Sequence, residues 1–108
     1  MPELPEVQTI VNELNDSIIG QTVESVKVLR DSVINLPAED FKKCIEGKLI
    51  AGVTRKGKYI LFDLENNLWL ISHLRMTGKF VVATTPEQSA YNRVQFRLSN
   101  GKTLIFED

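Results

Sequence analysis

The sequence predicts an α+β domain that is mainly β: an antiparallel β-sandwich flanked by two α-helices, the first of which carries the start of the chain. Apolar residues recur at helical spacing in two stretches, while six or seven other stretches have the pattern of short strands between turn residues. Strands joined by such short connections pair antiparallel, and helices then cover their faces.

The first helix is predicted almost at the amino terminus. Pro5 and Glu6 suit its first turn, because a proline loses no hydrogen bond there and a carboxylate meets the positive end of the helix dipole. Gly20 suits its exit. The apolar positions that would face a core recur every three or four residues: Val7, Ile10, Val11, Leu14 and Ile18.

The remaining elements follow from alternation and turn chemistry. Residues 21–29 alternate as a strand, and Pro37 and Gly47 bracket a second, shorter helix. Asn100-Gly101 is the strongest hairpin signal, because both residues tolerate positive φ. Further strands are expected at residues 49–54, 59–64, 68–74, 80–84, 94–98 and 103–106.

Length and composition favour one globular domain. The chain has 108 residues, of which 43% are hydrophobic and 25% are charged. It has no apolar stretch of the roughly 20 residues that span a bilayer, and Glu3 and Glu6 stand where a secretory signal would be basic. A cytoplasmic protein is therefore expected. Cys44 and His73 alone cannot build a zinc site, so no metal or cofactor is expected in this chain.

The charge balance by itself does not suggest binding to nucleic acid. Thirteen basic and fourteen acidic residues give a net charge of -1, whereas nucleic-acid binders usually have a basic excess. The last three residues, 106–108, follow an apolar strand without a polar tail. Both observations lead us to expect that residues 1–108 form a single domain of a larger protein.

The first six residues, Met-Pro-Glu-Leu-Pro-Glu, suggest nucleophilic chemistry. Removal of Met1 is expected before the small Pro2 and would leave a secondary amine, which titrates near pH ~8 and is partly nucleophilic at neutral pH. Its imine with a sugar carbon stays a cationic iminium, which is an electron sink. Glu3 could then move protons and Glu6 could hold the terminus. Ordinary helix capping is the alternative explanation for Pro5 and Glu6.

Three segments together resemble a known family. Residues 1–7 read Met-Pro-Glu-Leu-Pro-Glu-Val, residues 55–59 Arg-Lys-Gly-Lys-Tyr, and residues 72–79 Ser-His-Leu-Arg-Met-Thr-Gly-Lys. In order and spacing they resemble formamidopyrimidine-DNA glycosylase, the bacterial enzyme that removes 8-oxoguanine and ring-opened purines from DNA. Leu4 favours this family over the related endonuclease VIII, which typically has glycine there. The resemblance covers essentially the whole chain.

The resemblance implies a role for each matching residue. Pro2 would be the Schiff-base nucleophile, Glu3 the catalytic acid and Glu6 the second glutamate, while Lys58 would contact a phosphate and assist β-elimination. His73 would contact a phosphate, and Met76 would wedge into the space left by the extruded base. The residues expected to bind DNA are His73, Arg75, Met76, Tyr91 and Arg93.

Each of these residues also has a plain structural explanation. A lone Lys58 could be a solvated lysine at a strand end, His73 a hydrogen-bonded histidine of a sheet, and Met76 a core residue. Tyr91-Asn92-Arg93 stands where the family often has His-Asp-His, which weakens the inference for Tyr91 and Arg93. The family's helix-two-turn-helix and zinc-finger domains, with its one structural zinc and the arginine of δ-elimination, are absent from the sequence.

The sequence as a whole predicts a bifunctional enzyme of DNA base-excision repair, a glycosylase and abasic-site lyase that works by β,δ-elimination on oxidised purines. Its expected partner is damaged double-stranded DNA, with no membrane partner. A monomer in the bacterial cytoplasm, associated with the nucleoid, is expected. The isolated domain is expected to be inactive or weakly active. The alternative is a non-catalytic DNA-binding or structural module on the same scaffold.

Overall fold

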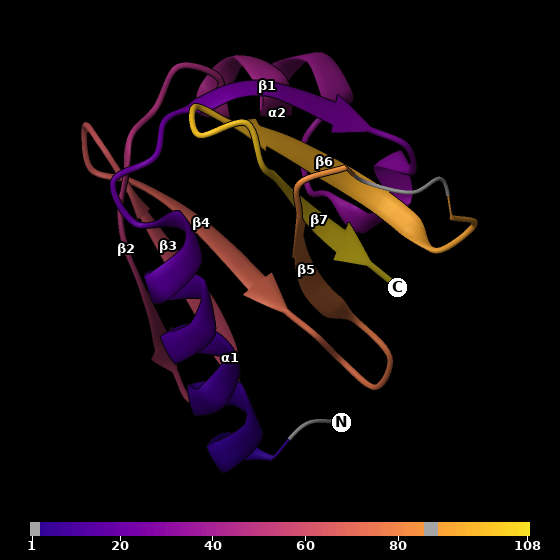
Figure 1. Cartoon of the computed structure of the whole chain (residues 1–108). Helices are drawn as coiled ribbons and strands as arrows, with labels where there is room; N and C mark the ends of the chain where they lie inside the picture. Colours follow the sequence, from indigo (N-terminus) through magenta and orange to yellow (C-terminus); the bar gives the residue numbers. More distant parts are fainter. Residues whose placement is uncertain (1–2, 86–88) are drawn as a thin grey trace.

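A computed structural model describes residues 3–85 and 89–108 and shows two antiparallel sheets with two α-helices among the described residues (Figure 1). The predicted fold class is confirmed, and the observed ends of the elements fall within a residue or two of the predicted ones. The elements in chain order are α1 (Leu4–Ile18), β1 (Val23–Val28), a 3₁₀ turn (Asp31–Val33), α2 (Ala38–Ile45), β2 (Ile50–Lys56), β3 (Tyr59–Leu64), β4 (Leu68–His73), β5 (Lys79–Ala83), β6 (Asn92–Leu98) and β7 (Thr103–Glu107).

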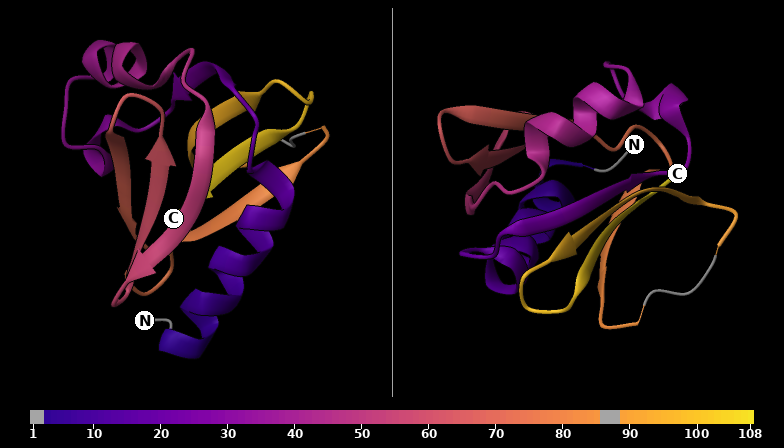
Figure 2. Two further views of the ribbon diagram at one scale, coloured as in Figure 1. Left: turned by 90° about the vertical axis from the view of Figure 1, so that its left-hand side faces the viewer. Right: turned by 90° about the horizontal axis from the view of Figure 1, so that it is seen from above.

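The strands divide into two layers. A four-stranded sheet has the order β1-β6-β7-β5, and a three-stranded sheet has the order β2-β3-β4. Every pairing is antiparallel. Buried side chains from both sheets and both helices form one apolar cluster, so the layers pack as a sandwich (Figure 2). Both β2 and β4 are edge strands of the smaller sheet.

Helix α1 runs alongside β2 and buries one stripe of its surface (Figure 1). The stripe consists of Val7, Val11, Leu14 and Ile18, each at most 4% exposed. Burial of such aliphatic side chains contributes about 1.5–3 kcal/mol each, so the stripe determines which face of the helix meets the core. Pro5 lies in the first turn, as predicted, and the helix starts directly after Glu3.

The side chains of strand β3 alternate between the core and the opposite face of the sheet. Ile60 and Phe62 are at most 1% exposed and Leu64 is 2% exposed, whereas Tyr59 is 52% exposed. Successive side chains of a strand point to opposite faces, so burial of Ile60 and Phe62 directs Tyr59 away from the core. The same alternation makes the first residue of β3 part of an accessible surface.

The connection between β4 and β5 is a tight turn that only glycine can close. The backbone N–H of Gly78 donates to the carbonyl oxygen of Leu74 over 2.8 Å. A Cβ atom at position 78 would lie 2.5 Å from that same oxygen, closer than atoms of this kind approach. Arg75, inside the turn, has a positive φ of 58°. The sequence pattern Thr77-Gly78 predicted a turn here, and the turn projects residues 75–77 from the sheet.

Candidate functional site

Glu3 and Lys58 meet at the start of the chain. Glu3 is the N-cap of α1, and its Oε2 lies 3.9 Å from Nζ of Lys58. Their side chains are 72% and 33% exposed. An exposed ion pair of this kind contributes about 0–1 kcal/mol to stability, so folding does not require it. The pair does bring a carboxylate and an ammonium group together at the start of α1.

A two-residue hairpin presents Lys58 to α1. Lys56 pairs with Tyr59, which leaves Gly57 and Lys58 as the loop between β2 and β3. Gly57 has a φ of 59°, and a glycine at the first loop position suits the tight turns that join antiparallel strands. The hairpin explains why Gly57 precedes Lys58 in the sequence, and it holds the base of the lysine side chain on a rigid support.

His73 lies beside this hairpin on the last residue of β4. It pairs with Tyr59 across the ladder, and the two rings meet edge to face with centroids 5.0 Å apart. The backbone N–H of Arg75 donates to Nδ1 of His73 over 3.0 Å. A nitrogen that accepts a hydrogen bond carries no proton, so the neutral ring carries its proton on Nε2. Nδ1 therefore has the structural role expected of a hydrogen-bonded sheet histidine. The other nitrogen, Nε2, carries the N–H that can donate to another group.

Met76 is fully presented by the β4–β5 turn. Its side chain is 80% exposed, so the alternative assignment of Met76 to the core is wrong. An exposed apolar side chain at the tip of a turn can enter the stack of a nucleic acid without unfolding its own support. Arg75, the preceding residue, is also exposed.

Tyr91 and Arg93 lie on another part of the surface, at the start of β6. Tyr91 is 65% exposed. The guanidinium of Arg93 donates to the carbonyl oxygen of Ala90 over 2.7 Å, and its own carbonyl oxygen accepts from the backbone N–H groups of Leu29 and Arg30. Arg93 is thus fixed at the base of the loop.

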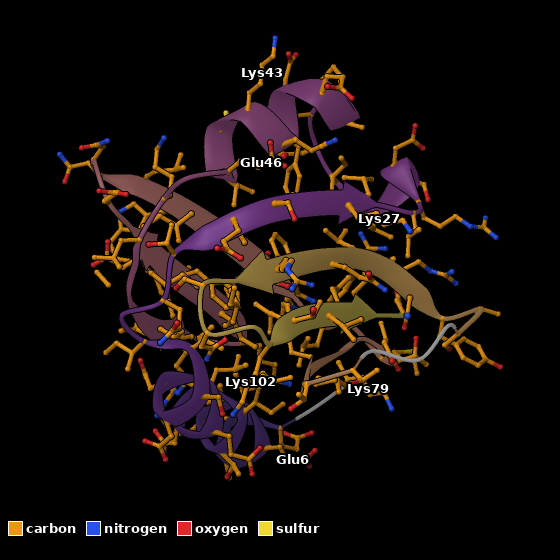
Figure 3. All side chains as sticks on the ribbon, turned by 45° about the horizontal axis from the view of Figure 1, so that its top comes forward. Glu6, Lys27, Lys43, Glu46, Lys79 and Lys102 are labelled. Carbon is orange, nitrogen blue, oxygen red and sulfur yellow. The ribbon has the colours of Figure 1, made fainter. Side chains whose placement is uncertain are left out.

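A groove of about 1110 Å³ extends between His73, Arg75 and Arg93. It runs beside the edge strand β4 and is lined by residues of both sheets and by the segment before α2. Its charged lining residues are Arg30, Arg75, Arg93 and Asp108, with His73 beside them. Three guanidinium groups against one carboxylate give a local positive excess that the net charge of -1 conceals. Four lysines labelled in Figure 3 do not line the groove. They lie on β1 (Lys27), on α2 (Lys43), on β5 (Lys79) and in the β6–β7 turn (Lys102).

The other two predicted catalytic residues are Pro2 and Glu6. Pro2 lies outside the described residues. Glu6 is exposed in the first turn of α1, as predicted (Figure 3). Within residues 3–85 and 89–108, no cluster of histidine, cysteine and carboxylate side chains is arranged to hold a metal ion. None of the helices in this part of the chain is long and apolar enough to cross a membrane.

Tyr59 is the site residue that sequence reasoning did not single out. It belongs to the Arg-Lys-Gly-Lys-Tyr segment, but its contact with His73 depends on the register between β3 and β4. The pairing could have been foreseen from the short connection Glu65–Asn67, since a hairpin closed there aligns Leu64 with Leu68 and hence Tyr59 with His73.

Comparison with known proteins gives consistent results. The sequence model described as "Formamidopyrimidine-DNA glycosylase N-terminal domain" matches residues 1–108. A formamidopyrimidine-DNA glycosylase of Protochlamydia amoebophila is 46% identical over 112 residues, and one of Lactiplantibacillus plantarum is 38% identical over 109. In both cases all of this chain matches 40% of the relative, so the chain spans well under half of its relatives' length.

Solved structures agree with the sequence comparisons. A complex between the Lactococcus lactis Fpg and an abasic site-containing DNA matches with a TM-score of 0.94 and 35% identity, over 99% of this chain and 40% of the other. A complex of the Lactococcus lactis Fpg with a Fapy-dG-containing DNA matches with a TM-score of 0.93 and 36% identity, over 98% of this chain and 40% of the other.

Proposed function

Since the chain belongs to the formamidopyrimidine-DNA glycosylase N-terminal domain family, we propose that residues 1–108 are the catalytic amino-terminal domain of a larger DNA base-excision repair enzyme. The enzyme is a glycosylase and abasic-site lyase that acts on damaged double-stranded DNA. Its relatives' length, of which this chain matches 40%, supports a second, DNA-binding portion.

The single observation that carries the proposal is the meeting of Glu3 and Lys58 beside the amino terminus, at 3.9 Å. Pro2 directly precedes Glu3 in the sequence. With Met1 removed, its secondary amine attacks C1′ of the damaged nucleoside, and the base leaves with the electron pair of its bond to C1′ and takes up the proton that the amine loses. The sugar ring then opens as the bond from C1′ to the ring oxygen breaks, and Glu3 supplies a proton to that oxygen. The product is an iminium ion between the terminal nitrogen and C1′.

The iminium ion then drives strand cleavage. Loss of a proton from C2′ gives an enamine, and the electron pair of the enamine then expels the 3′-phosphate and restores the iminium ion. Loss of a proton from C4′ expels the 5′-phosphate in a second elimination. Lys58 places its ammonium group beside the phosphate of the reacting nucleotide, where negative charge develops. Glu6, in the first turn of α1, helps to orient the terminus.

Contacts to the DNA backbone and to the gap in the stack complete the proposal. His73 donates Nε2–H to a phosphate, and Met76 fills the space of the extruded nucleotide. Arg75 and Arg93, which line the groove, and Tyr91, which lies outside it, add contacts to the DNA backbone. A relative's complex with Fapy-dG-containing DNA supports oxidised purines as the lesion class, and its complex with abasic-site DNA supports the lyase step.

We propose a monomeric enzyme of the bacterial cytoplasm that works at the nucleoid. Residues 1–108 use no cofactor of their own, and the family's structural zinc belongs to the remaining portion.

Trapping of the iminium ion tests the proposal. The chain, with its amino terminus verified by mass spectrometry, is mixed with duplex DNA that contains an abasic site and is reduced with borohydride, alone and with the unmatched portion of the Lactococcus lactis relative in trans. We expect a covalent complex through Pro2 in the presence of the added portion. A chain with an acetylated terminus is the matched control, because an amide nitrogen cannot attack.

The outcome separates two functions. If the processed chain forms no covalent complex even with the added portion, while it still binds the DNA, the catalytic proposal fails and a non-catalytic DNA-binding module is the function that remains. Alone, the domain is expected to bind duplex DNA weakly and with strong salt dependence.

A further inference from the structure

Asn15 of α1 forms a two-way hydrogen-bond pair with the backbone of Val53 in β2. Its Nδ2 donates to the carbonyl oxygen of Val53 over 2.5 Å, and its Oδ1 accepts from the backbone N–H of Val53 over 2.9 Å. Val53 is 2% exposed, so these backbone groups have little access to water. A single side-chain amide therefore satisfies both polar groups of one buried residue.

The pair replaces a missing neighbouring strand. Val53 lies opposite Phe62 in the ladder with β3, and β2 is an edge of its sheet. In an antiparallel strand the N–H and C=O of one residue point to the same side, so those of Val53 point away from β3, toward α1. An asparagine amide has the same donor and acceptor as a peptide group. Asn15 thus closes the open edge of β2 at this position.

The hydrogen bonds of Asn15 fix the position of α1 along its own axis, which apolar packing leaves undetermined. The apolar stripe of α1 determines which face of the helix is buried, but hydrophobic contact is non-directional and tolerates sliding along the helix axis. The two bonds to Val53 are directional and act on one residue. They therefore define the axial position of α1 on β2.

A second contact lies closer to the amino terminus. Nε of Arg55, two residues after Val53 on β2, donates to Oε1 of Gln8 over 2.8 Å. The amide nitrogen of Gln8 in turn donates to Oδ1 of Asn12 over 2.9 Å, one helical turn further along. Arg55 also donates to the carbonyl oxygen of Gly57 over 3.4 Å, in the loop that presents Lys58. The start of α1 and this loop are thereby tied to the same arginine.

From these contacts we propose that Asn15, together with Gln8 and Arg55, positions α1 on β2 so that Glu3 lies beside Lys58. Helix α1 and strand β2 run in opposite directions at these contacts: Asn15 meets Val53, and Gln8, nearer the start of α1, meets Arg55, nearer the β2–β3 loop. The next contact in the same direction is the 3.9 Å pair of Glu3 and Lys58. A slip of one residue moves a helix by ~1.5 Å and turns it by ~100°, which would separate the pair.

The consequence for chemistry rests on the proposed function. Asn15 and Gln8 touch neither substrate nor reacting atoms; they act through the position of the terminal amine and Glu3. Misplacement of reacting groups by about 1 Å costs up to about 100-fold in rate, with little effect on binding. Loss of these anchors should therefore lower the rate of iminium formation and spare DNA affinity.

The substitution Asn15→Leu tests the anchor, because leucine has the same branching as asparagine but no hydrogen-bonding atoms. Two matched variants keep both anchors: Asp16→Ala changes an exposed neighbour on α1, and Ile18→Val removes one buried methyl group and so controls for lost stability. Amide hydrogen exchange and backbone NMR shifts are recorded for each variant. We expect faster exchange at Val53 and shifted signals at Gly57 and Lys58 in Asn15→Leu only.

Single-turnover borohydride trapping with abasic-site DNA, with the relative's unmatched portion in trans, gives the functional measurement. We expect the trapping rate of Asn15→Leu to fall by about 10-fold or more, with a dissociation constant for the DNA within about twofold of the original. Asn15→Asp keeps the acceptor for the N–H of Val53 and loses the donor. Its trapping rate should lie between the rates of Asn15→Leu and the unsubstituted chain. Asp16→Ala and Ile18→Val should trap at the original rate.

The possible failures are distinct. Unchanged exchange at Val53, or unchanged NMR signals at Gly57 and Lys58, in Asn15→Leu overturns the anchoring role whether or not the chain traps DNA. A normal trapping rate in a variant with an altered Val53 overturns the link from anchor to chemistry. Absence of trapping by the unsubstituted chain contradicts the proposed function alone, and the exchange and NMR measurements then decide the anchoring role.

Discussion

The backbone N–H of Arg75 donates a hydrogen bond to Nδ1 of His73, over 3.0 Å. Arg75 has a left-handed backbone conformation, with φ at 58°, and its N–H points back toward the imidazole ring. Protonation of Nδ1 would set two donors against each other and break the bond. With Nδ1 occupied as an acceptor, the neutral tautomer of His73 has its N–H at Nε2.

This relationship predicts different effects for two substitutions of His73. The amide nitrogen of glutamine reaches the place of Nε2, whereas that of asparagine reaches the place of Nδ1. We expect His73→Gln to keep most of the affinity for duplex DNA and His73→Asn to lose about 10-fold, as expected for one hydrogen bond to a charged group. Fluorescence anisotropy measures both affinities, and equal losses would contradict the assignment. Nitrogen NMR of the imidazole should show Nδ1 without a proton.

Lys58 is predicted to act as a charge where His73 acts as a neutral donor. Lys58→Gln should lower the slope of log affinity against log salt by about one, while His73→Asn should leave that slope unchanged. The measurement is a salt titration of DNA binding. Thermal unfolding should show that Lys58→Gln changes stability by less than about 1 kcal/mol, because its contact with Glu3 is exposed. A large loss of stability would assign Lys58 a structural role.

Gly78 should be essential for the turn that carries Met76. In Gly78→Ala the new Cβ would meet the Leu74 carbonyl oxygen at 2.5 Å, and the backbone must shift to relieve the contact. We expect a loss of about 1–3 kcal/mol in the free energy of unfolding. Gly52→Ala is the matched control, because a Cβ there meets no atom within 4 Å. If denaturant unfolding gives equal results for the two variants, the steric explanation is wrong.

Met76 should matter for lesion processing and not for folding. Its side chain is 80% exposed, so Met76→Ala should change the free energy of unfolding by less than about 0.5 kcal/mol. Under the proposed function, alanine no longer replaces the stacking that is lost when a nucleotide is extruded, which predicts slower base release from lesion-containing duplex. Met76→Leu should retain most of the rate. A duplex with an unpaired lesion should reduce the defect, since less stacking is then lost.

Most of the elements could be predicted from sequence because each depends on local pattern. The apolar stripe of α1 and the alternation in β3 appear directly in residue order, and residues Asn100-Gly101 mark the β6–β7 hairpin. The order of strands was less accessible. β5 pairs with β7 and β1 pairs with β6, and neither partner is adjacent in sequence.

The site shows the same division. Glu3, Lys58, His73 and Met76 could be selected from the order of three segments. The residue type of Glu3 suits proton transfer, and those of the other three suit contact with DNA. The relation of Tyr59 to His73 and the assignment of the Nε2–H required the register of two strands and the path of a turn. The exposure of Met76 excluded a core position, which the sequence had left open.

By itself the sequence determined the fold class, the positions of helices and strands, and the family, because these follow from periodicity and from short contiguous segments. Tertiary structure alone decided how Asn15 meets Val53, how Arg55 meets Gln8, and how Glu3 comes to lie 3.9 Å from Lys58. The reason is physical: these contacts join residues up to 55 positions apart in the numbering, between Glu3 and Lys58, and no local preference specifies such a distance. It arises only when a helix takes one axial position on one strand.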